Sequence, residues 1–228
     1  MAQTQALTQE DRADYARDGF LAIDQVTTPA EVEALRAIYD RLFEEPGLVP
    51  DADRFELVGD PDQAPQLPQV TNPERYAPEL LATQAFASAQ EIARSLLGDE
   101  AVSAGMHAIR KPAGSSAETP WHQDEAYWDP AMDHHALSIW IPLQPVDQAN
   151  GCMQFIPGSH RSGITAHELV NPNAHGLRLT EEPDQEAVVV CALPAGGATV
   201  HDSKTVHYTG PNRSAEPRRA LIIAFSAP

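Results

Sequence analysis

From residue 99 onward the chain consists of short apolar segments separated by turn residues, and this pattern restricts the fold more than any other feature. The segments span 101–110, 121–126, 136–143, 152–156, 187–192, 197–202, 204–208 and 218–226. Their lengths and the turn residues between them predict about eight β-strands. About eight strands suit a cupin-like jelly roll, in which two antiparallel sheets pack face to face. The sequence therefore predicts an all-β core.

The first 98 residues are expected to form flanking helices and a long loop. Thr8 and Asp11 have the spacing of a capping box, so a first helix should end near Gly19 before a brief strand at 20–23. Thr28 and Glu31 have the same spacing, and a Pro at the first helical position strengthens that signal. The apolar positions Val32, Leu35, Tyr39 and Leu42 then fall on one helical face.

A further helix is expected at 78–97, ended by Gly98. The stretch 43–78 is rich in Pro and Asp, so it is expected to be an irregular connection, either a surface wrap or a wall of a substrate pocket. Residues 1–228 are interpreted as one domain, with 1–98 as the mainly helical flank and 99–228 as the jelly-roll core.

The predicted strand at 121–126 contains His122 and Asp124, two residues apart. Alternate side chains of a strand leave the same face, so this spacing directs an imidazole and a carboxylate into one space. The triplet alone is weak evidence, since a chain with nine histidines can contain it by chance in a solvated loop. It indicates half of a metal site.

The end of the chain supplies residues that complete such a site. His207 precedes a turn rich in Gly, Pro, Asn and Ser, and Arg218 opens the apolar run after it. Two imidazoles and one carboxylate on one face of an octahedron leave three positions open, which suits a non-haem Fe(II) that binds a co-substrate and O₂. An arginine nearby grips a carboxylate through paired hydrogen bonds.

Other histidines and arginines compete for these roles. His201 is the main rival to His207, but the turn and the spacing to Arg218 favour His207. Arg213 falls in the turn, and strand alternation puts Arg219 on the face opposite to Arg218. His134 and His135 are expected to be solvated or at a pocket rim, and His160 to shape a turn.

Several ordered motifs resemble those of the phytanoyl-CoA dioxygenase family of Fe(II)- and 2-oxoglutarate-dependent oxygenases. They lie at 15–23, 121–124, 138–143, 150–161 and 194–197, followed by His207 and Arg218, so the resemblance covers most of the chain. It implies a double-stranded β-helix that uses Fe(II), 2-oxoglutarate and O₂. It also implies that 2-oxoglutarate is converted to succinate and CO₂ while an unactivated C–H bond of a small metabolite is hydroxylated.

The resemblance assigns three further roles. Asp124 fills a position that related halogenases leave to chloride, which favours hydroxylation, while desaturation, ring formation and epimerisation stay open. Trp140 corresponds to a tryptophan beside 2-oxoglutarate, with a core aromatic as the alternative. Thr209 shares a strand face with His207 and offers a hydroxyl to the co-substrate's carboxylate, where family members often carry serine.

The substrate is less constrained by the sequence. Glu125, Tyr127 and Trp128 directly follow the metal-binding stretch and are candidates for one side of a pocket, with Glu125 attracting a cation. The polar segment 163–186 is a candidate lid. The family name points to an acyl-CoA, which a patch of Arg110, Lys111 and Arg161 would favour, whereas the acidity of the whole chain disfavours it.

Charge and cysteine content exclude some partners and compartments. The net charge of −18 repels nucleic acids and anionic membranes, and the sequence contains no apolar run of the roughly 20 residues that a membrane span requires. Met1 to Gln5 lack the features of a signal peptide, and Cys152 and Cys191 are expected to be reduced and buried. A cytoplasmic protein that acts on a small molecule is expected. The sequence carries no signal of oligomeric state.

Two other classes of function compete with this interpretation. A cupin-like metalloenzyme that does not use 2-oxoglutarate would release no succinate, and its activity would barely depend on Arg218. A non-catalytic jelly roll that binds a metabolite would not bind Fe(II), and replacing His122 would leave its ligand affinity intact.

Overall fold

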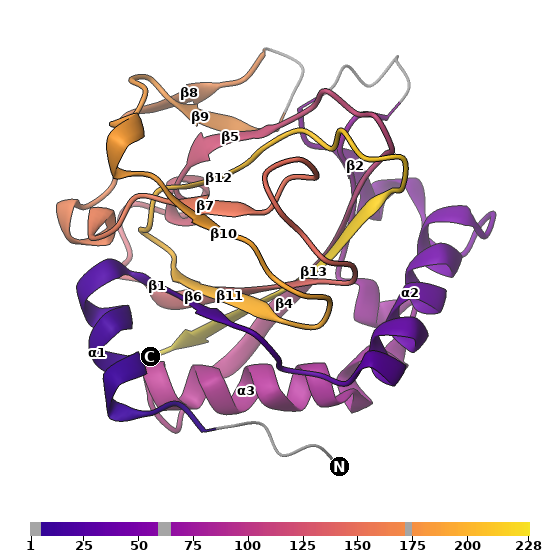
Figure 1. The fold of residues 1–228 in the computed structure, drawn as a ribbon, viewed down its shortest axis with the longest axis horizontal. Helices are drawn as coiled ribbons and strands as arrows, with labels where there is room; N and C mark the ends of the chain where they lie inside the picture. The colour runs from indigo at the N-terminus through magenta and orange to yellow at the C-terminus, as the bar shows by residue number, and fades with distance from the viewer. Residues whose placement is uncertain (1–5, 59–64, 172–174) are drawn as a thin grey trace.

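The computed structural model describes residues 6–58, 65–171 and 175–228, which form two facing β-sheets, a separate β-hairpin and three α-helices (Figure 1). The helices are α1 (Gln9–Asp18), α2 (Pro29–Glu44) and α3 (Gln84–Leu97). The strands are β1 (Phe20–Ile23), β2 (Arg54–Glu56), β3 (Pro68–Thr71), β4 (Val102–Lys111), β5 (Thr119–His122), β6 (His135–Pro142), β7 (Met153–Phe155), β8 (His167–Leu169), β9 (Leu177–Leu179), β10 (Val189–Cys191), β11 (Ala198–Asp202), β12 (His207–Thr209) and β13 (Arg218–Ala227). The residues 1–5, for which no signal peptide was expected, lie outside this description, as do 59–64 and 172–174.

The two sheets give the expected jelly-roll core. The larger sheet has the strand order β1-β11-β6-β13-β4-β3-β2, and the smaller sheet has the order β10-β7-β12-β5. All eight segments predicted after residue 99 contain a strand. Two of these segments are strands over only part of their length: 121–126 leaves the strand at His122, after which Asp124–Tyr127 form a turn of 3₁₀-helix, and 204–208 enters its strand only at His207. Strands β8 and β9, in the polar segment 163–186, were not predicted.

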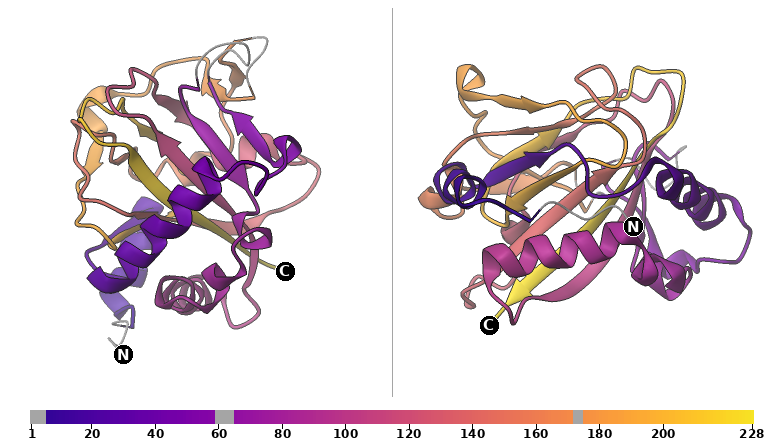
Figure 2. Two further views of the ribbon diagram at one scale, coloured as in Figure 1. Left: turned by 90° about the vertical axis from the view of Figure 1, so that its right-hand side faces the viewer. Right: turned by 60° about the horizontal axis from the view of Figure 1, so that its bottom comes forward.

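Alternation along β13 separates the two faces of the larger sheet. Leu221, Ile223 and Phe225 point to the outer face, where they join the main apolar core with residues of α2 and α3. Helix α3 runs across this outer face and contacts β13 and β6 (Figure 2). Arg218 and Ile222 point to the inner face, toward the smaller sheet. The helices therefore support the sheet from behind, while its inner face is free to form a site.

The first helix has the predicted capping signals. The Thr8 side chain accepts a hydrogen bond from the Asp11 backbone N–H, and the Asp11 carboxylate accepts one in return from the Thr8 backbone N–H. Gly19 ends the helix with φ +83°, a left-handed conformation that glycine adopts without strain. A Cβ at Gly19 would collide with His160, which packs against this turn as expected.

The second helix differs from the expected capping box. The Thr28 hydroxyl accepts a hydrogen bond from the Glu31 backbone N–H, as predicted. The Glu31 carboxylate instead accepts hydrogen bonds from the backbone N–H groups of Gln84 (2.7 Å) and Ala85 (2.9 Å), at the start of α3. Glu31 therefore links the starts of two helices and satisfies N–H groups that a helix terminus leaves free.

Replacing Glu31 with alanine should lower the free energy of unfolding by about 2 kcal/mol, because two partly buried N–H groups at the start of α3 lose their carboxylate acceptor. Thermal or urea unfolding measures this change. Glu33→Ala is the matched control, since Glu33 is exposed and, among the described residues, pairs only with Arg36, so its loss should cost less than about 0.5 kcal/mol. Equal losses in the two variants would contradict the linking role of Glu31.

The predicted helix at 78–97 is divided into two parts. Residues Pro78–Ala82 form a 3₁₀-helix, and α3 begins only after Thr83, whose hydroxyl accepts a hydrogen bond from the Phe86 backbone N–H. A threonine at this position favours a new N-cap over a continuous helix. Gly98 ends α3 as expected.

The connection 43–78 contributes two strands that the sequence did not indicate. Strands β2 and β3 pair with each other, and β3 pairs with β4, so they extend the larger sheet at one edge. The expectation of an irregular connection was therefore wrong for Arg54–Glu56 and Pro68–Thr71. Within the described parts of the chain, none of the helices combines the length and the apolar character needed to cross a bilayer.

Candidate metal centre

His122 and His207 lie directly opposite each other on β5 and β12, which are antiparallel neighbours in the smaller sheet. Both side chains leave the face that is directed at the larger sheet, and their ring centroids are 4.1 Å apart. The sheet pairing thus brings together two residues that are far apart in the sequence.

Both imidazoles present Nε2 to the space between the sheets. His122 Nδ1 lies 2.8 Å from the Pro120 carbonyl oxygen, and His207 Nδ1 lies 2.9 Å from the Thr205 carbonyl oxygen. A carbonyl can only accept, so each Nδ1 carries the proton and each Nε2 has a free lone pair. Burial lowers the pKa of both histidines, which keeps the rings neutral and able to bind a metal.

Asp124 completes the group from the 3₁₀-helix that follows β5. The intervening Gln123 is still extended (φ −124°, ψ 134°), so the predicted alternation holds although the strand has ended. Asp124 Oδ1 lies 3.7 Å from His122 Nε2 and 3.5 Å from His207 Nε2. Ligands of one metal at about 2.1 Å stand roughly 3 Å apart, so the three atoms match a shared ion with small adjustments.

The other oxygen of Asp124 is held by residues of the larger sheet. The Ser138 hydroxyl donates a 2.7 Å hydrogen bond to Oδ2, and His201 Nε2 lies 3.3 Å from the same atom. Burial raises the pKa of Asp124, but the imidazoles of His207, His201 and His122 lower it by more, so the carboxyl group is ionised. His201 thus lies beside Asp124, outside the group of three potential ligands formed by His122, Asp124 and His207.

A buried arginine, Arg218, lies in the same space between the two sheets, and none of the described residues forms a salt bridge with it. Arg218 is 1% exposed, and its Nε and Nη1 atoms make no hydrogen bond with any residue the structure describes. Its guanidinium carbon lies 5.4 Å from the ring centre of Trp140. Burial lowers the pKa of Arg218 to about 10, so the group is still a cation at neutral pH. Such a group normally pairs with a carboxylate.

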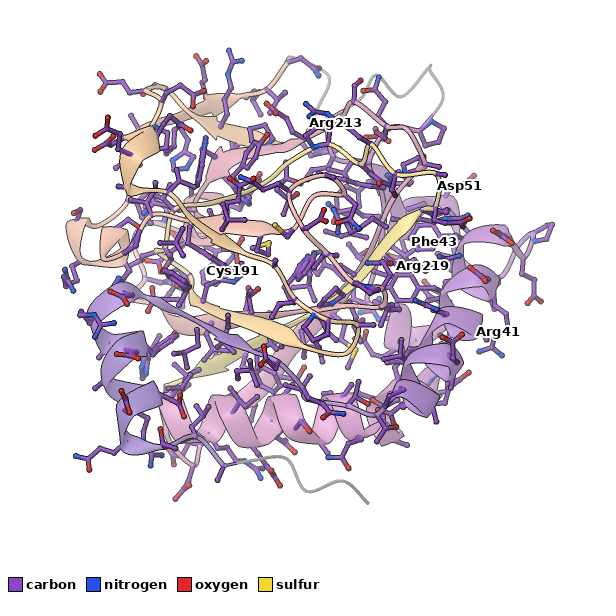
Figure 3. The ribbon with its side chains drawn as sticks, viewed as in Figure 1. Arg41, Phe43, Asp51, Cys191, Arg213 and Arg219 are labelled. Carbon is purple, nitrogen blue, oxygen red and sulfur yellow. The ribbon has the colours of Figure 1, made fainter. Side chains whose placement is uncertain are left out.

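The residue next to Arg218 in sequence has a different environment. Arg219 is on the opposite face of β13 and binds Asp40 of α2, with Nη2 at 2.7 Å from Oδ1 (Figure 3). Arg213 is in the turn after β12 and faces solvent. Among these three arginines, only Arg218 lines the cavity.

The cavity between the sheets has a volume of about 250 Å³. The residues that line it are Phe55, Leu57, Gln69, His107, Ile109, Thr119, His122, Asp124, Tyr127, Trp128, Ser138, Trp140, Met153, His175, His201, His207, Thr209, Arg218, Ile222 and Ala224. It contains the three potential metal ligands and the unpaired arginine together. Phe55, Leu57 and Gln69 come from the connection after α2, which therefore forms a pocket wall.

Comparisons with known proteins agree with this geometry. The phytanoyl-CoA dioxygenase (PhyH) family matches residues 15–220. The chain belongs to this family. It is 27% identical to an ectoine dioxygenase of Bordetella parapertussis, over 97% of this chain and 76% of that protein. It is 23% identical to the human peroxisomal phytanoyl-CoA dioxygenase, over 97% of this chain and 69% of that protein.

A solved structure extends the comparison to the co-substrate. EvdO2 from Micromonospora carbonacea var. aurantiaca, crystallised with 2-oxoglutarate, is 36% identical and superposes with a TM-score of 0.85, over all of this chain and 94% of that chain. Membership of the phytanoyl-CoA dioxygenase family, these relatives and the His-Asp-His group identify the protein as an Fe(II)- and 2-oxoglutarate-dependent dioxygenase. The two competing classes of function do not account for these findings.

The predicted substrate residues divide into two sets. Tyr127 and Trp128 line the cavity, as expected for this side of the site. Glu125 does not line it: its carboxylate accepts a 2.7 Å hydrogen bond from the Ser203 hydroxyl and lies 3.5 Å from Lys204 Nζ. The 3₁₀-helix rotates successive side chains by about a third of a turn, which directs Glu125 away from the cavity.

The basic patch considered for a CoA group is dispersed in the fold. Arg110 binds Glu44 at 2.9 Å, and Arg161 binds the backbone of Arg17. Lys111 is fully buried, and its ammonium group donates to the Thr209 hydroxyl (2.9 Å) and to the Thr209 and Gly210 carbonyls. The Thr209 hydroxyl in turn donates to Thr119 Oγ1 at 2.9 Å.

The residues that sequence reasoning missed at this site include Thr119, Ser138, His107 and Gln69, together with the buried Lys111 behind Thr209. Ser138 had a usable signal, since it is two residues before Trp140 on a predicted strand and so shares its face. Thr119 had none, because it precedes Pro120 outside the predicted segment. His107 and Lys111 lie on one face of β4. Because lysine is rarely buried, Lys111 was assigned to a surface patch.

Gln123 connects the metal-binding stretch to two neighbouring loops. It is fully buried, and its amide nitrogen donates to the Gly163 carbonyl (2.9 Å) and the Lys204 carbonyl (2.6 Å). Its amide oxygen accepts from the backbone N–H and the hydroxyl of Thr165, both at 2.9 Å. Because Gln123 stands between His122 and Asp124, these bonds fix the backbone that carries both residues.

The isosteric change Gln123→Glu should lower the free energy of unfolding by about 2–3 kcal/mol, since a carboxylate would face two carbonyl oxygens in a buried site. Chemical unfolding measures this loss. Gln185→Glu is the control, because Gln185 is exposed and its amide donates to the Pro183 carbonyl at the surface, and it should change stability by less than about 0.5 kcal/mol. Wild-type stability of Gln123→Glu would show that Gln123 does not fix this backbone.

Proposed function

We propose that His122 Nε2, His207 Nε2 and one oxygen of Asp124 hold Fe(II), and that the enzyme hydroxylates a small metabolite. The support is the chemistry of the donor set: two neutral imidazoles and one ionised carboxylate, with all three ligand atoms within 4.8 Å of one another. When bound, iron together with 2-oxoglutarate and O₂ supplies the oxidising power for attack on a C–H bond and releases succinate and CO₂. The Ser138 hydrogen bond to Asp124 Oδ2 leaves Oδ1 for the metal.

Arg218 binds the far carboxylate of 2-oxoglutarate in this proposal. The single observation that carries it is a buried, unpaired guanidinium in the same cavity as the three ligands. Trp140 packs beside the guanidinium and keeps that end of the cavity dry, which strengthens the ion pair. The Thr209 hydroxyl donates its proton to Thr119 Oγ1. The Thr119 hydroxyl proton is therefore the one that can be donated to the carboxylate of 2-oxoglutarate, while Thr209 orients the Thr119 hydroxyl.

The environment of the iron favours hydroxylation. Asp124 occupies the ligand position that a halide would need, and its pKa keeps it ionised. The neutral histidines require no proton to be removed before the metal binds. The chain's own residues thus hold the metal and the co-substrate and exclude water, and none of them is required as a general acid or base.

The setting of the site supports three further parts of the proposal. Residues 1–228 act as one domain, because α2 and α3 share their apolar core with the larger sheet. Burial raises the pKa of the free thiols Cys152 and Cys191 to about 11 and about 12, so both are unreactive, and reduced cysteines fit a cytoplasmic enzyme. The substrate is a small molecule, since acidity repels nucleic acid, and Arg110, Lys111 and Arg161 are dispersed and do not form a patch for a CoA phosphate.

Turnover with 2-oxoglutarate tests this function. The purified protein, supplied with Fe(II), ascorbate, 2-oxoglutarate and O₂, should form succinate slowly without substrate and faster with an accepted metabolite from a screened collection. Chelation of the metal should stop succinate formation. Oxygen uptake without succinate would favour the cupin-like alternative, and the absence of both reactions throughout the screen would favour a binding protein.

A further inference from the structure

The cavity around the His-Asp-His group contains few permanent charges. Among the described residues that line it, only Asp124 and Arg218 are charged at every pH near neutrality. The proposed function uses both of them, one for iron and one for 2-oxoglutarate. The charges of Fe(II) and Arg218 then balance those of Asp124 and the two carboxylates of 2-oxoglutarate. A loaded site therefore has no surplus charge for an ionised substrate group.

The buried lysine lies behind Thr209, outside the cavity. Lys111 is not among the residues that line the cavity, and its ammonium group is surrounded by oxygens of Thr209 and Gly210. Burial lowers its pKa well below the ordinary value, and the neighbouring Arg218 lowers it further. Moving an ionised substrate group from water into the loaded cavity, where it would find no counter-charge, is strongly unfavourable.

Two neutral polar side chains on the larger sheet remain free to recognise a substrate. His107 on β4 and Gln69 on β3 both line the cavity, and His107 Nδ1 lies 3.4 Å from Gln69 Oε1. Burial lowers the pKa of His107, with Asp124 acting in the opposite direction, so the ring is neutral. An amide oxygen only accepts, which places the proton on Nδ1 and the lone pair on Nε2. Nε2 makes no hydrogen bond with any residue in the described part of the chain.

The rest of the lining is mainly aromatic or apolar, and the exposed His175, packed edge-on against Phe55, is a further polar side chain in it. Phe55, Trp128 and Met153 offer only apolar or aromatic surface, apart from the indole N–H. The Tyr127 hydroxyl already accepts a 2.7 Å hydrogen bond from the Leu177 backbone N–H. The cavity volume of about 250 Å³ is below the roughly 300–1,000 Å³ of typical ligand sites, so only a small group can enter beside 2-oxoglutarate.

We propose that the substrate group that enters this cavity is uncharged and donates a hydroxyl hydrogen bond to His107 Nε2, with its apolar part against Phe55, Tyr127 and Trp128. This inference rests on the proposed function, because only bound iron and 2-oxoglutarate neutralise Asp124 and Arg218. Ectoine, named for one relative of this chain, is a zwitterion with an ionised carboxylate, so the proposal separates this site from that one. His107 and Gln69 are then specificity residues.

Three probes that share a six-membered ring test the charge preference: 1,2-cyclohexanediol, cyclohexanecarboxylate and cyclohexylamine in its ammonium form. The enzyme is loaded anaerobically with Fe(II) and 2-oxoglutarate, and binding is measured from the broadening of probe proton NMR signals by the paramagnetic iron. The diol should bind at least about tenfold more tightly than either ion. Equal or tighter binding of an ionic probe, or no binding of the diol, would overturn the inference.

Variants of His107 test the hydrogen bond. His107→Leu keeps a similar side-chain volume but has no hydrogen-bond acceptor, so it should lower the affinity for the diol about fivefold. His107→Gln should retain most of that affinity, because its amide oxygen can accept the hydrogen bond. His135→Leu is the matched control: His135 is exposed at the start of β6, outside the cavity, and its loss should leave diol binding unchanged. Wild-type affinity in His107→Leu would refute the role of His107.

The same samples separate this inference from the function on which it rests. The loaded enzyme should show the visible absorption band of an iron complex with 2-oxoglutarate in the wild type and in each His107 variant, which also shows that the variants fold. Absence of the band in the wild type would contradict the proposed function. A normal band together with a preference for an ionic probe would contradict only the proposed substrate class.

Discussion

His207→Ala should lower the affinity for Fe(II) by more than about 100-fold, because it removes one of three protein ligands and leaves the opposing imidazole and Asp124 without their partner. The two remaining ligand atoms are 3.7 Å apart, and two ligands hold a divalent metal far less tightly than three. Anaerobic titration with Fe(II), followed by calorimetry, measures the loss. Succinate formation should fall to the level of the metal-free enzyme.

His201→Ala is the matched control for that result. His201 is as buried as His207, and its Nε2 lies 3.3 Å from Asp124 Oδ2, yet it stands outside the ligand group. Its replacement should lower the affinity for Fe(II) by no more than about tenfold, as expected for a residue that contacts a metal ligand but does not bind the metal. A larger loss in His201→Ala than in His207→Ala would exchange the roles assigned to these histidines.

Arg218→Met should raise the KM for 2-oxoglutarate by about 30-fold to 100-fold while leaving Fe(II) affinity close to wild type. The side chains are similar in length, so the change removes the charged hydrogen bonds to the co-substrate, which are worth about 2–3 kcal/mol. Succinate formation as a function of 2-oxoglutarate concentration measures the effect.

Arg219→Met provides the comparison on the same strand. Arg219 points to the other face of β13 and pairs with Asp40, so its loss should leave the KM for 2-oxoglutarate unchanged within about twofold. If Arg218→Met had a wild-type KM, the unpaired guanidinium would not be the co-substrate's partner. The cupin-like alternative would then regain support.

The residues that the sequence located correctly are those whose roles follow from backbone periodicity. Alternation within β13 separated Arg218 from Arg219, and the His-x-Asp spacing kept His122 and Asp124 in one space even though β5 ends between them. These relations depend only on neighbours along the chain. Pairing of β5 with β12 then needed the family resemblance, since no local pattern specifies which strands meet.

The errors arose where long-range contacts decide the structure. Glu31 has the spacing of a capping box, but the start of α3 competes successfully for its carboxylate. Glu125 was expected in the pocket, but the chain turns into a 3₁₀-helix after Gln123 and directs it to Ser203. Strands β2 and β3 exist because the edge of β4 accepts them, despite a sequence rich in Pro and Asp.

Lys111 illustrates the same limit inside the site. The sequence grouped it with Arg110 and Arg161 in a basic patch, yet the strand continues to Lys111 and buries it against Thr209. Three oxygen acceptors from the β12 end compensate the buried ammonium group, and only the folded chain brings them together. Buried polar networks of this kind follow from tertiary structure.

The most direct test of the account is an anaerobic spectroscopic titration of the purified protein with Fe(II) and 2-oxoglutarate. A visible charge-transfer band is expected that saturates at one iron and one 2-oxoglutarate per chain, is absent in His207→Ala and needs much more 2-oxoglutarate in Arg218→Met. A wild-type protein that binds Fe(II) without this band, or a band of equal strength in His207→Ala, would contradict it.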